Sequence, residues 1–176
     1  MAIITVSRLY GSGGSEVAER IAHELGWQLL DNAFVDEVAA RLGTPPAEVE
    51  AREERLIEVT ERIIIEAASR GHSVLVGRGA QSVLAARQDV LHVFCYAPRA
   101  ALVARAARRL AVSDKDAEKI VDDTNRQRDH YVRTYWKRSW RAHENYHLCL
   151  NTDWLGIDGA ADIVVRLARE KFAASA

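Results

Sequence analysis

The sequence has few cysteines, only three prolines and no long apolar run. Its two cysteines, Cys95 and Cys149, have no second cysteine within a few residues, which excludes a CxxC zinc pair and a disulfide framework. Both lie inside apolar runs, so we expect two buried, reduced thiols. No apolar stretch reaches the roughly 18 residues that span a membrane, and residues 1–14 lack the pattern of a secretory signal. We therefore expect a cytoplasmic protein with no membrane contact.

Neither sign of charge dominates the chain. Its 176 residues include 24 lysines and arginines and 25 aspartates and glutamates, for a net charge of −1. This balance disfavours a uniformly basic surface for nucleic acid. Hydrophobic residues make up 48% and charged residues 28%, which excludes wholesale disorder and predicts one globular domain at this length.

Short apolar runs alternate with longer stretches of helical spacing. Continuous apolar strands separated by helices predict an α/β fold, with a five-stranded parallel sheet covered by helices on both faces. The segments 31–72 and 111–146 are longer than a simple crossover requires. Strands are predicted over 3–6, 27–30, 73–76, 90–96 and 147–150, and helices over 14–25, 32–42, 47–70, 99–110, 113 or 114 to 136, and 158–172.

A glycine-rich segment, SRLYGSGGS at residues 7–15, joins the first predicted strand to the first predicted helix. Glycines let the backbone turn tightly and approach a ligand closely. Free N–H groups at a helix N-terminus attract anions, and the first strand-to-helix turn is the usual phosphate site of an open α/β sheet. The sequence therefore predicts a phosphate-binding loop. It consists of Gly11, Ser12, Gly13, Gly14 and Ser15.

The loop matches the P-loop pattern G-x-x-x-x-G-K-[ST] only in part. With the second glycine of the pattern placed on Gly13, Ser15 provides the hydroxyl that would contact Mg²⁺. Gly14 then stands in place of the lysine, and Arg8 in place of the first glycine. Because phosphoryl transfer requires charge neutralisation, we predict that Arg8 supplies the missing positive charge.

The dinucleotide pattern G-x-G-x-x-G is a competing interpretation. Gly11 and Gly13 fit it, and Asp31 lies twenty residues after Gly11, as that motif expects. Glu16 stands at the third glycine, however, where its side chain would crowd the packing of helix on strand. A dinucleotide-binding oxidoreductase is therefore the least favoured alternative.

Three segments in this order resemble the cytidylate kinase-like family, a branch of the P-loop nucleoside monophosphate kinases. They are SRLYGSGG at 7–14, VGRGA at 76–80 and NYHLCLNT at 145–152. The resemblance implies a single P-loop kinase-like domain over 1–176, with an acceptor-binding lobe at about 31–72 and a lid at about 111–146. It also implies ATP and Mg²⁺ as cofactors and a nucleoside monophosphate such as CMP as substrate. Gly14 and Gly79 stand where true cytidylate kinases have lysine and aspartate.

Other charged residues follow the predicted strands or lie in the predicted lid. Arg78 follows the third strand, and we predict that it holds the acceptor phosphate. Asp31 ends the second strand and is predicted to contact the acceptor or a metal-bound water. Arg126 and Arg133, seven residues apart on one helix face, are predicted to join Arg8 in catalysis, whereas Arg128 is expected to point elsewhere.

Other interpretations stay open at this point. The missing lysine is also consistent with a nucleotide-binding sensor that has lost catalysis. The stretch 130–140 mixes aromatic and basic residues, which is typical of single-strand nucleic-acid binding but also of an amphipathic helix whose aromatic residues pack inward. The long helix predicted over 47–70 has the apolar spacing to form a homodimer contact or to pack on its own sheet.

Overall fold

The computed structural model describes residues 2–31 and 53–173. Its centre is a sheet of five parallel strands in the order β2-β3-β1-β4-β5, which confirms the predicted α/β fold. The strands are β1 (Ile3–Arg8), β2 (Gln28–Leu30), β3 (Ser73–Val76), β4 (Val90–Tyr96) and β5 (Leu148–Asn151).

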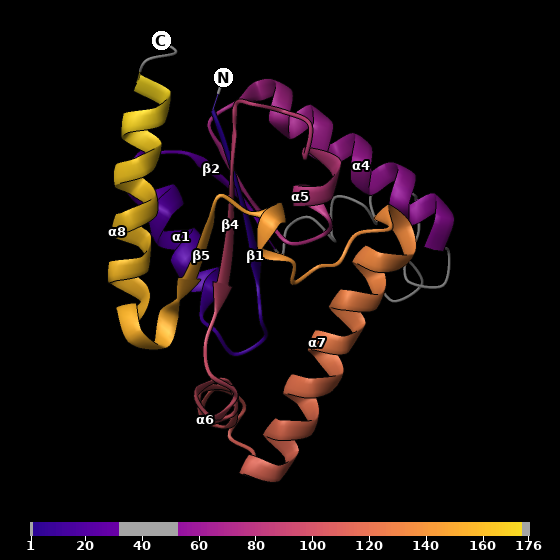
Figure 1. Cartoon of the computed structure of the whole chain (residues 1–176), viewed down its shortest axis with the longest axis vertical. Helices are drawn as coiled ribbons and strands as arrows, with labels where there is room; N and C mark the ends of the chain where they lie inside the picture. Colours follow the sequence, from indigo (N-terminus) through magenta and orange to yellow (C-terminus); the bar gives the residue numbers. More distant parts are fainter. Residues whose placement is uncertain (1, 32–52, 174–176) are drawn as a thin grey trace.

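Helices cover both faces of the sheet (Figure 1). α1 (Gly14–Leu25) and α8 (Thr152–Ala173) pack on one face, and α4 (Glu53–Arg70) and α5 (Ala80–Val83) on the other. α6 (Arg99–Leu110) and α7 (Asp114–Trp136) form a helical pair beyond the carboxyl ends of the strands, and a short helix, η1 (His143–Asn145), precedes β5. Among the described helices, none combines the length and apolarity needed to cross a bilayer.

Alternate residues of the central strand β1 supply two cores. Ile4 and Val6 are buried against α1 and α8, whereas Ile3 is buried against α4 and α5. Because both faces of this strand are buried, apolar residues follow one another along it without a polar alternation. This continuous apolar run made β1 recognisable in the sequence. Ile63 and Ile64 of α4 belong to the second core, so this helix packs on its own sheet.

The predicted helices agree with the structure except near their ends. The predicted helix over 47–70 is observed as α4 from Glu53, and the helix predicted over 32–42 lies outside the described residues. α7 begins where predicted, because the Ser113 hydroxyl accepts a hydrogen bond from the Asp116 amide at 3.2 Å. The last helix begins six residues earlier than predicted, at Thr152, and Gly156, with φ of 72°, interrupts its first turns.

The prediction of two buried thiols was wrong for one of them. Cys95 lies in β4, inside the sheet, and burial raises its pKa to about 12. Cys149 is exposed. It lies on β5, which is an edge strand with only one neighbouring strand, so its outward-facing side chain is less completely covered.

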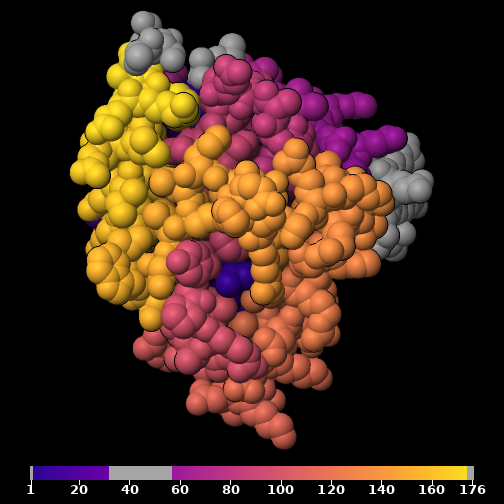
Figure 2. Space-filling model, viewed as in Figure 1, coloured from indigo at the N-terminus to yellow at the C-terminus, as the bar shows by residue number. Residues whose placement is uncertain are grey.

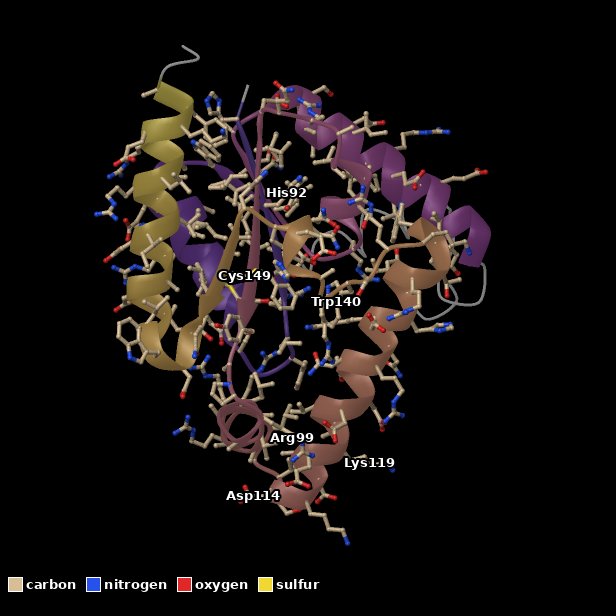
Figure 3. The ribbon with its side chains drawn as sticks, viewed as in Figure 1. His92, Arg99, Asp114, Lys119, Trp140 and Cys149 are labelled. Carbon is tan, nitrogen blue, oxygen red and sulfur yellow. The ribbon has the colours of Figure 1, made fainter. Side chains whose placement is uncertain are left out.

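His92 of β4 is a buried titratable group in the middle of the sheet (Figure 3). Its Nδ1 lies 2.7 Å from the Thr5 hydroxyl, and its ring stacks on His147 with 5.2 Å between centroids. Burial first, and then the neighbouring His147 and Arg138, lower the pKa of His92 from 6.5 to about 4. The folded protein therefore holds this histidine neutral at pH 7.

The neutral His92 predicts a loss of stability in acid. The unfolded chain takes up a proton on this histidine near pH 6.5, but the folded chain does so only near pH 4. The free energy of unfolding therefore falls through this window, by about 2 kcal/mol from this residue between pH 7 and pH 5. His92→Asn keeps an amide beside Thr5 and cannot titrate. Urea denaturation at both pH values should show a smaller fall in the variant, and equal falls would contradict the assignment.

Candidate functional site

The predicted phosphate loop joins β1 to α1 at the carboxyl edge of the sheet. Gly11 and Gly13 have φ of 84° and 76°, the left-handed region that glycine adopts without strain. A Cβ on Gly11 would overlap the Leu102 backbone, and one on Gly13 would overlap Arg105 and Ile157. The loop is thus packed against α6 and α8, and both glycines are required by that packing.

Three hydrogen bonds anchor the loop from behind. The Ser12 carbonyl accepts bonds from the Thr152 hydroxyl and from Arg105 Nη1, each at 2.5 Å. The Tyr10 amide donates to Asn125 Oδ1 at 2.8 Å. Ser12 is fully buried, and its amide donates to the Leu9 carbonyl at 3.1 Å, so its backbone is part of the loop's own bonding. The first N–H groups of α1 have no acceptor within the helix and are available to an anion.

A hollow of about 300 Å³ opens over the loop and brings together most of the predicted site. We call it the loop hollow. Its acidic groups include Glu16 and Glu19 near Ser15, a set of hard oxygen donors of the kind that Mg²⁺ prefers. The residues present therefore fit a nucleotide with its magnesium ion. The lining includes Arg8, Tyr10, Gly11, Gly13, Gly14, Ser15, Asp31, Arg109 and Arg128.

Arg8 ends β1 and lies at the centre of the site. Its Nη2 is 3.6 Å from Asp31 Oδ1, and its side chain is 18% exposed. Among the described residues, its buried Nε has no hydrogen-bond partner. A Cβ on Gly14 would overlap the Arg8 Cβ and lie 3.0 Å from the Cys95 Cβ. The stem of Arg8 thus occupies the space that the first carbon of a P-loop lysine would need.

Arg128 belongs to the site, although we expected it to point elsewhere. Its Nη1 donates to the Arg8 carbonyl at 2.7 Å, and it lines the loop hollow. The sequence holds a signal for this placement. Arg128 shares intervals of three and four residues with Val121, Asn125 and Val132, which form the buried face of α7.

Arg126 and Arg133 lie on another face of α7. Their side chains are 75% and 63% exposed and pair with Asp123 and Asp129 of the same helix, at 3.2 and 3.0 Å. Both line a separate hollow. In the part of the chain that the structure describes, they are therefore not brought to the glycine loop, and their predicted catalytic role is left without geometric support.

The turn after β3 forms the far side of the site. Gly77, Arg78 and Gly79 all have positive φ, of 68°, 52° and 75°. A Cβ on Gly79 would overlap the ring of Trp136, whose Nε1 donates to Glu61 Oε1 at 2.9 Å. Gly79 therefore makes room for an aromatic side chain from α7. A hollow of about 50 Å³, the turn hollow, lies beside it and is lined by residues that include Arg8, Arg78, Arg128, Tyr131, Trp140 and Tyr146.

The charges of Arg8, Arg78 and Arg128 act on one another in this site, and the Asp31 carboxylate acts on Arg8 and Arg128. Burial, followed by repulsion from Arg8, lowers the pKa of Arg128 to about 10. Burial also lowers the pKa of Arg8, which Asp31 raises and Arg78 lowers further. A guanidinium normally stays protonated in proteins, so Arg8 and Arg128 keep positive charge in a buried place. An anion bound beside these two groups would be attracted by them, whereas Glu16, Glu19 and Asp31 balance the charge of the loop hollow as a whole.

Comparison with known proteins gives a family and a fold. The model of the cytidylate kinase-like family matches residues 3–154. No curated protein matches the chain. An uncharacterized protein from Eubacterium ventriosum is similar in structure, with a TM-score of 0.82 and 23% identity over 96% of this chain and 98% of that chain.

Two kinases of known type share the fold at lower similarity. A shikimate kinase from Acinetobacter baumannii, solved with shikimate, has a TM-score of 0.62 and 22% identity over 95% of this chain and 92% of its own. A gluconokinase from Sinorhizobium meliloti has a TM-score of 0.61 and 18% identity over 99% of this chain and 98% of its own. The fold is thus that of the P-loop kinases over nearly the whole chain.

Restoring the standard lysine should harm the protein. We expect Gly14→Lys to lower the free energy of unfolding by about 1–3 kcal/mol, because its Cβ overlaps the stem of Arg8. Gly159→Ala in α8 is a matched control, since the nearest atom to its new Cβ is 3.9 Å away. It should be neutral or stabilising by about 0.5–1 kcal/mol. Urea denaturation measures both, and a Gly14→Lys protein as stable as the wild type would contradict the packing argument.

Proposed function

The chain belongs to the cytidylate kinase-like family, and we propose that it is an ATP-dependent phosphotransferase whose acceptor is a nucleoside monophosphate such as CMP. One observation carries the proposal. Arg8 and Arg128 line both the hollow over the glycine loop and the turn hollow, where Arg78 joins them, and Arg8 faces Asp31 at 3.6 Å. Phosphoryl transfer depends on positioning and on neutralising charge that develops on the phosphate oxygens.

The loop hollow would bind ATP, the phosphate donor of the reaction. Backbone N–H groups of the predicted loop, residues 11–15, would hold the terminal phosphates of ATP at the N-terminus of α1. The Ser12 amide is the exception, because it already donates to the Leu9 carbonyl. Ser15, with the carboxylates of Glu16 and Glu19, would hold the magnesium ion, which neutralises phosphate charge when bound. Arg8 takes over the charge of the missing lysine, since its guanidinium faces Asp31 at 3.6 Å and lines the loop hollow.

The turn after β3 would bind the nucleoside monophosphate, the phosphate acceptor. Arg78 lines the turn hollow, next to Arg8 and Arg128, and would hold the phosphate of the monophosphate. Asp31 keeps Arg8 oriented and would contact the acceptor or a water on the metal. Arg128 lines both hollows, so it can bridge the donor and acceptor phosphates and stabilise the group in transfer.

A nucleotide-binding sensor is the second candidate, because Gly14 removes the usual lysine. A nucleic-acid binder is disfavoured by the packing of the aromatic residues. Trp140 is buried with Phe94 and Tyr146 in a core cluster, so it offers no free stacking surface.

Arg8→Ala and Arg128→Ala should each lower kcat/KM by about 10²–10³-fold, because each removes a fixed charge from the transferring phosphoryl group. The measurement is release of ADP with Mg²⁺, on a panel of nucleoside monophosphates together with shikimate and gluconate. Arg166→Ala is a control on the exposed side of α8 and should leave kcat/KM unchanged.

Calorimetric titration of ATP, with and without Mg²⁺, separates the two candidates. Turnover on one monophosphate that collapses in both variants supports the kinase. ATP binding without turnover on any acceptor supports the sensor. An absence of ATP binding to the wild type contradicts both.

A further inference from the structure

A third hollow, of about 620 Å³, lies between α6, α7 and the segment that follows α7. We call it the α6–α7 hollow. Figure 2 shows an opening on this face, framed by the pink segment before α6 and the orange segment after α7, with indigo atoms of the N-terminal part at its floor. Its volume is within the range of small-molecule sites, about 300–1,000 Å³. Its apolar lining comes from Leu9, Ala97, Leu102 and Val121.

The rim of this hollow is rich in charge. Four arginines and two aspartates line it, and Glu118 and Asp123 pair with two of the arginines from beside it. Arg99 is paired with Asp122 at 2.9 Å and with Glu118 at 3.4 Å. Arg126 pairs with the half-exposed Asp123 of its own helix, and Arg141 lies over the Trp140 ring with 5.8 Å to the centroid.

Three arginines of the rim act on the carboxylate of Asp122. The hydrogen bond from Arg99 lowers the pKa of Asp122, and the charges of Arg99, Arg126 and Arg141 lower it further. Three guanidinium groups from α6, α7 and the following segment thus act on a single half-exposed carboxylate. Among the described residues, Arg141 forms no ion pair, so its guanidinium is the rim charge most available to an anion.

The wall between this hollow and the loop hollow is thin. Leu9 lines both hollows. Asn125, which lines the α6–α7 hollow, accepts the hydrogen bond from the Tyr10 amide. Leu102, another lining residue, is the one whose backbone packs directly on Gly11. A molecule bound in this hollow therefore contacts Leu9, Leu102 and Asn125, three residues that pack on or bond to the glycine loop.

We propose that the α6–α7 hollow is a second ligand site, which takes a small organic anion with an apolar ring, and that its occupancy changes the affinity of the glycine loop for nucleotide. The ring lies on the apolar floor, and the anionic group is bound by Arg126 and Arg141 at the rim. The binding part of the proposal is independent of the proposed kinase activity. The coupling part rests on nucleotide binding at the loop.

The probe is 8-anilinonaphthalene-1-sulfonate, an aromatic sulfonate of this chemistry whose fluorescence rises on binding. We expect the double variant Arg126→Glu/Arg141→Glu to weaken its binding by about tenfold or more. The matched control is Lys115→Glu/Lys119→Glu, which makes the same change of net charge at two residues of α7 that do not line the hollow. It should leave the affinity within about twofold. Far-UV circular dichroism confirms that both variants are folded.

Equal probe affinity in the charge-reversed double variant and the control, or an absence of saturable binding to the wild type, overturns the second site. The coupling is tested by titrating ATP at rising probe concentration. A change in the ATP Kd that levels off, at about fivefold or more, supports coupling between two sites. An ATP Kd that rises without limit shows competition for one site and overturns the proposal. If ATP does not bind at all, the proposed function fails, while the comparison of the charge variants still decides the second site.

Discussion

The close packing of Arg8 on Gly14 is the contact on which the rest of the site depends. Because a side chain at position 14 would overlap the stem of Arg8, the loop has a glycine where a P-loop usually has its lysine. In the proposed function, the positive charge comes from Arg8 at the end of β1 in place of a lysine at the start of α1. The Arg8 guanidinium faces Asp31, and Arg128 donates a hydrogen bond to the Arg8 carbonyl.

α7 brings the separate parts of the site together. Its buried face carries Arg128 to Arg8 and Asn125 to the loop backbone, and its last residue, Trp136, covers the glycine of the turn after β3. Its other face carries Arg126 and Arg133 to a different hollow. One helix thus contributes to all three hollows, because arginines two residues apart point in different directions.

The fold could be predicted from the sequence because each strand of a covered parallel sheet is a short apolar run between glycines, prolines or polar residues. The loop could be predicted as well, since glycines at the first strand-to-helix turn have few other uses. The placement of Arg128 was predictable in principle, because its spacing to Val121, Asn125 and Val132 puts it beside the buried face of α7. The seven-residue spacing of Arg126 and Arg133 shows only that these two share a face, and not that the face is buried. The contact of Trp136 with Gly79 was not predictable, since it joins residues 57 positions apart through tertiary packing alone. The exposure of Cys149 depends on strand order, which no local pattern encodes.

The loop is encoded within the first fifteen residues, but the bonds that shape it come from the far end of the chain. Asn125 and Thr152 are separated from their partners in the loop by 115 and 140 residues. During synthesis, which proceeds from the N-terminus, the glycines therefore emerge long before the groups that hold them. A nascent chain that ends before β5 has the whole glycine motif with Arg105 and Asn125, but it lacks Thr152. The loop thus gains its full set of anchoring bonds late, when the last strand and helix have joined the sheet, which ties the shape of the loop to completion of the fold.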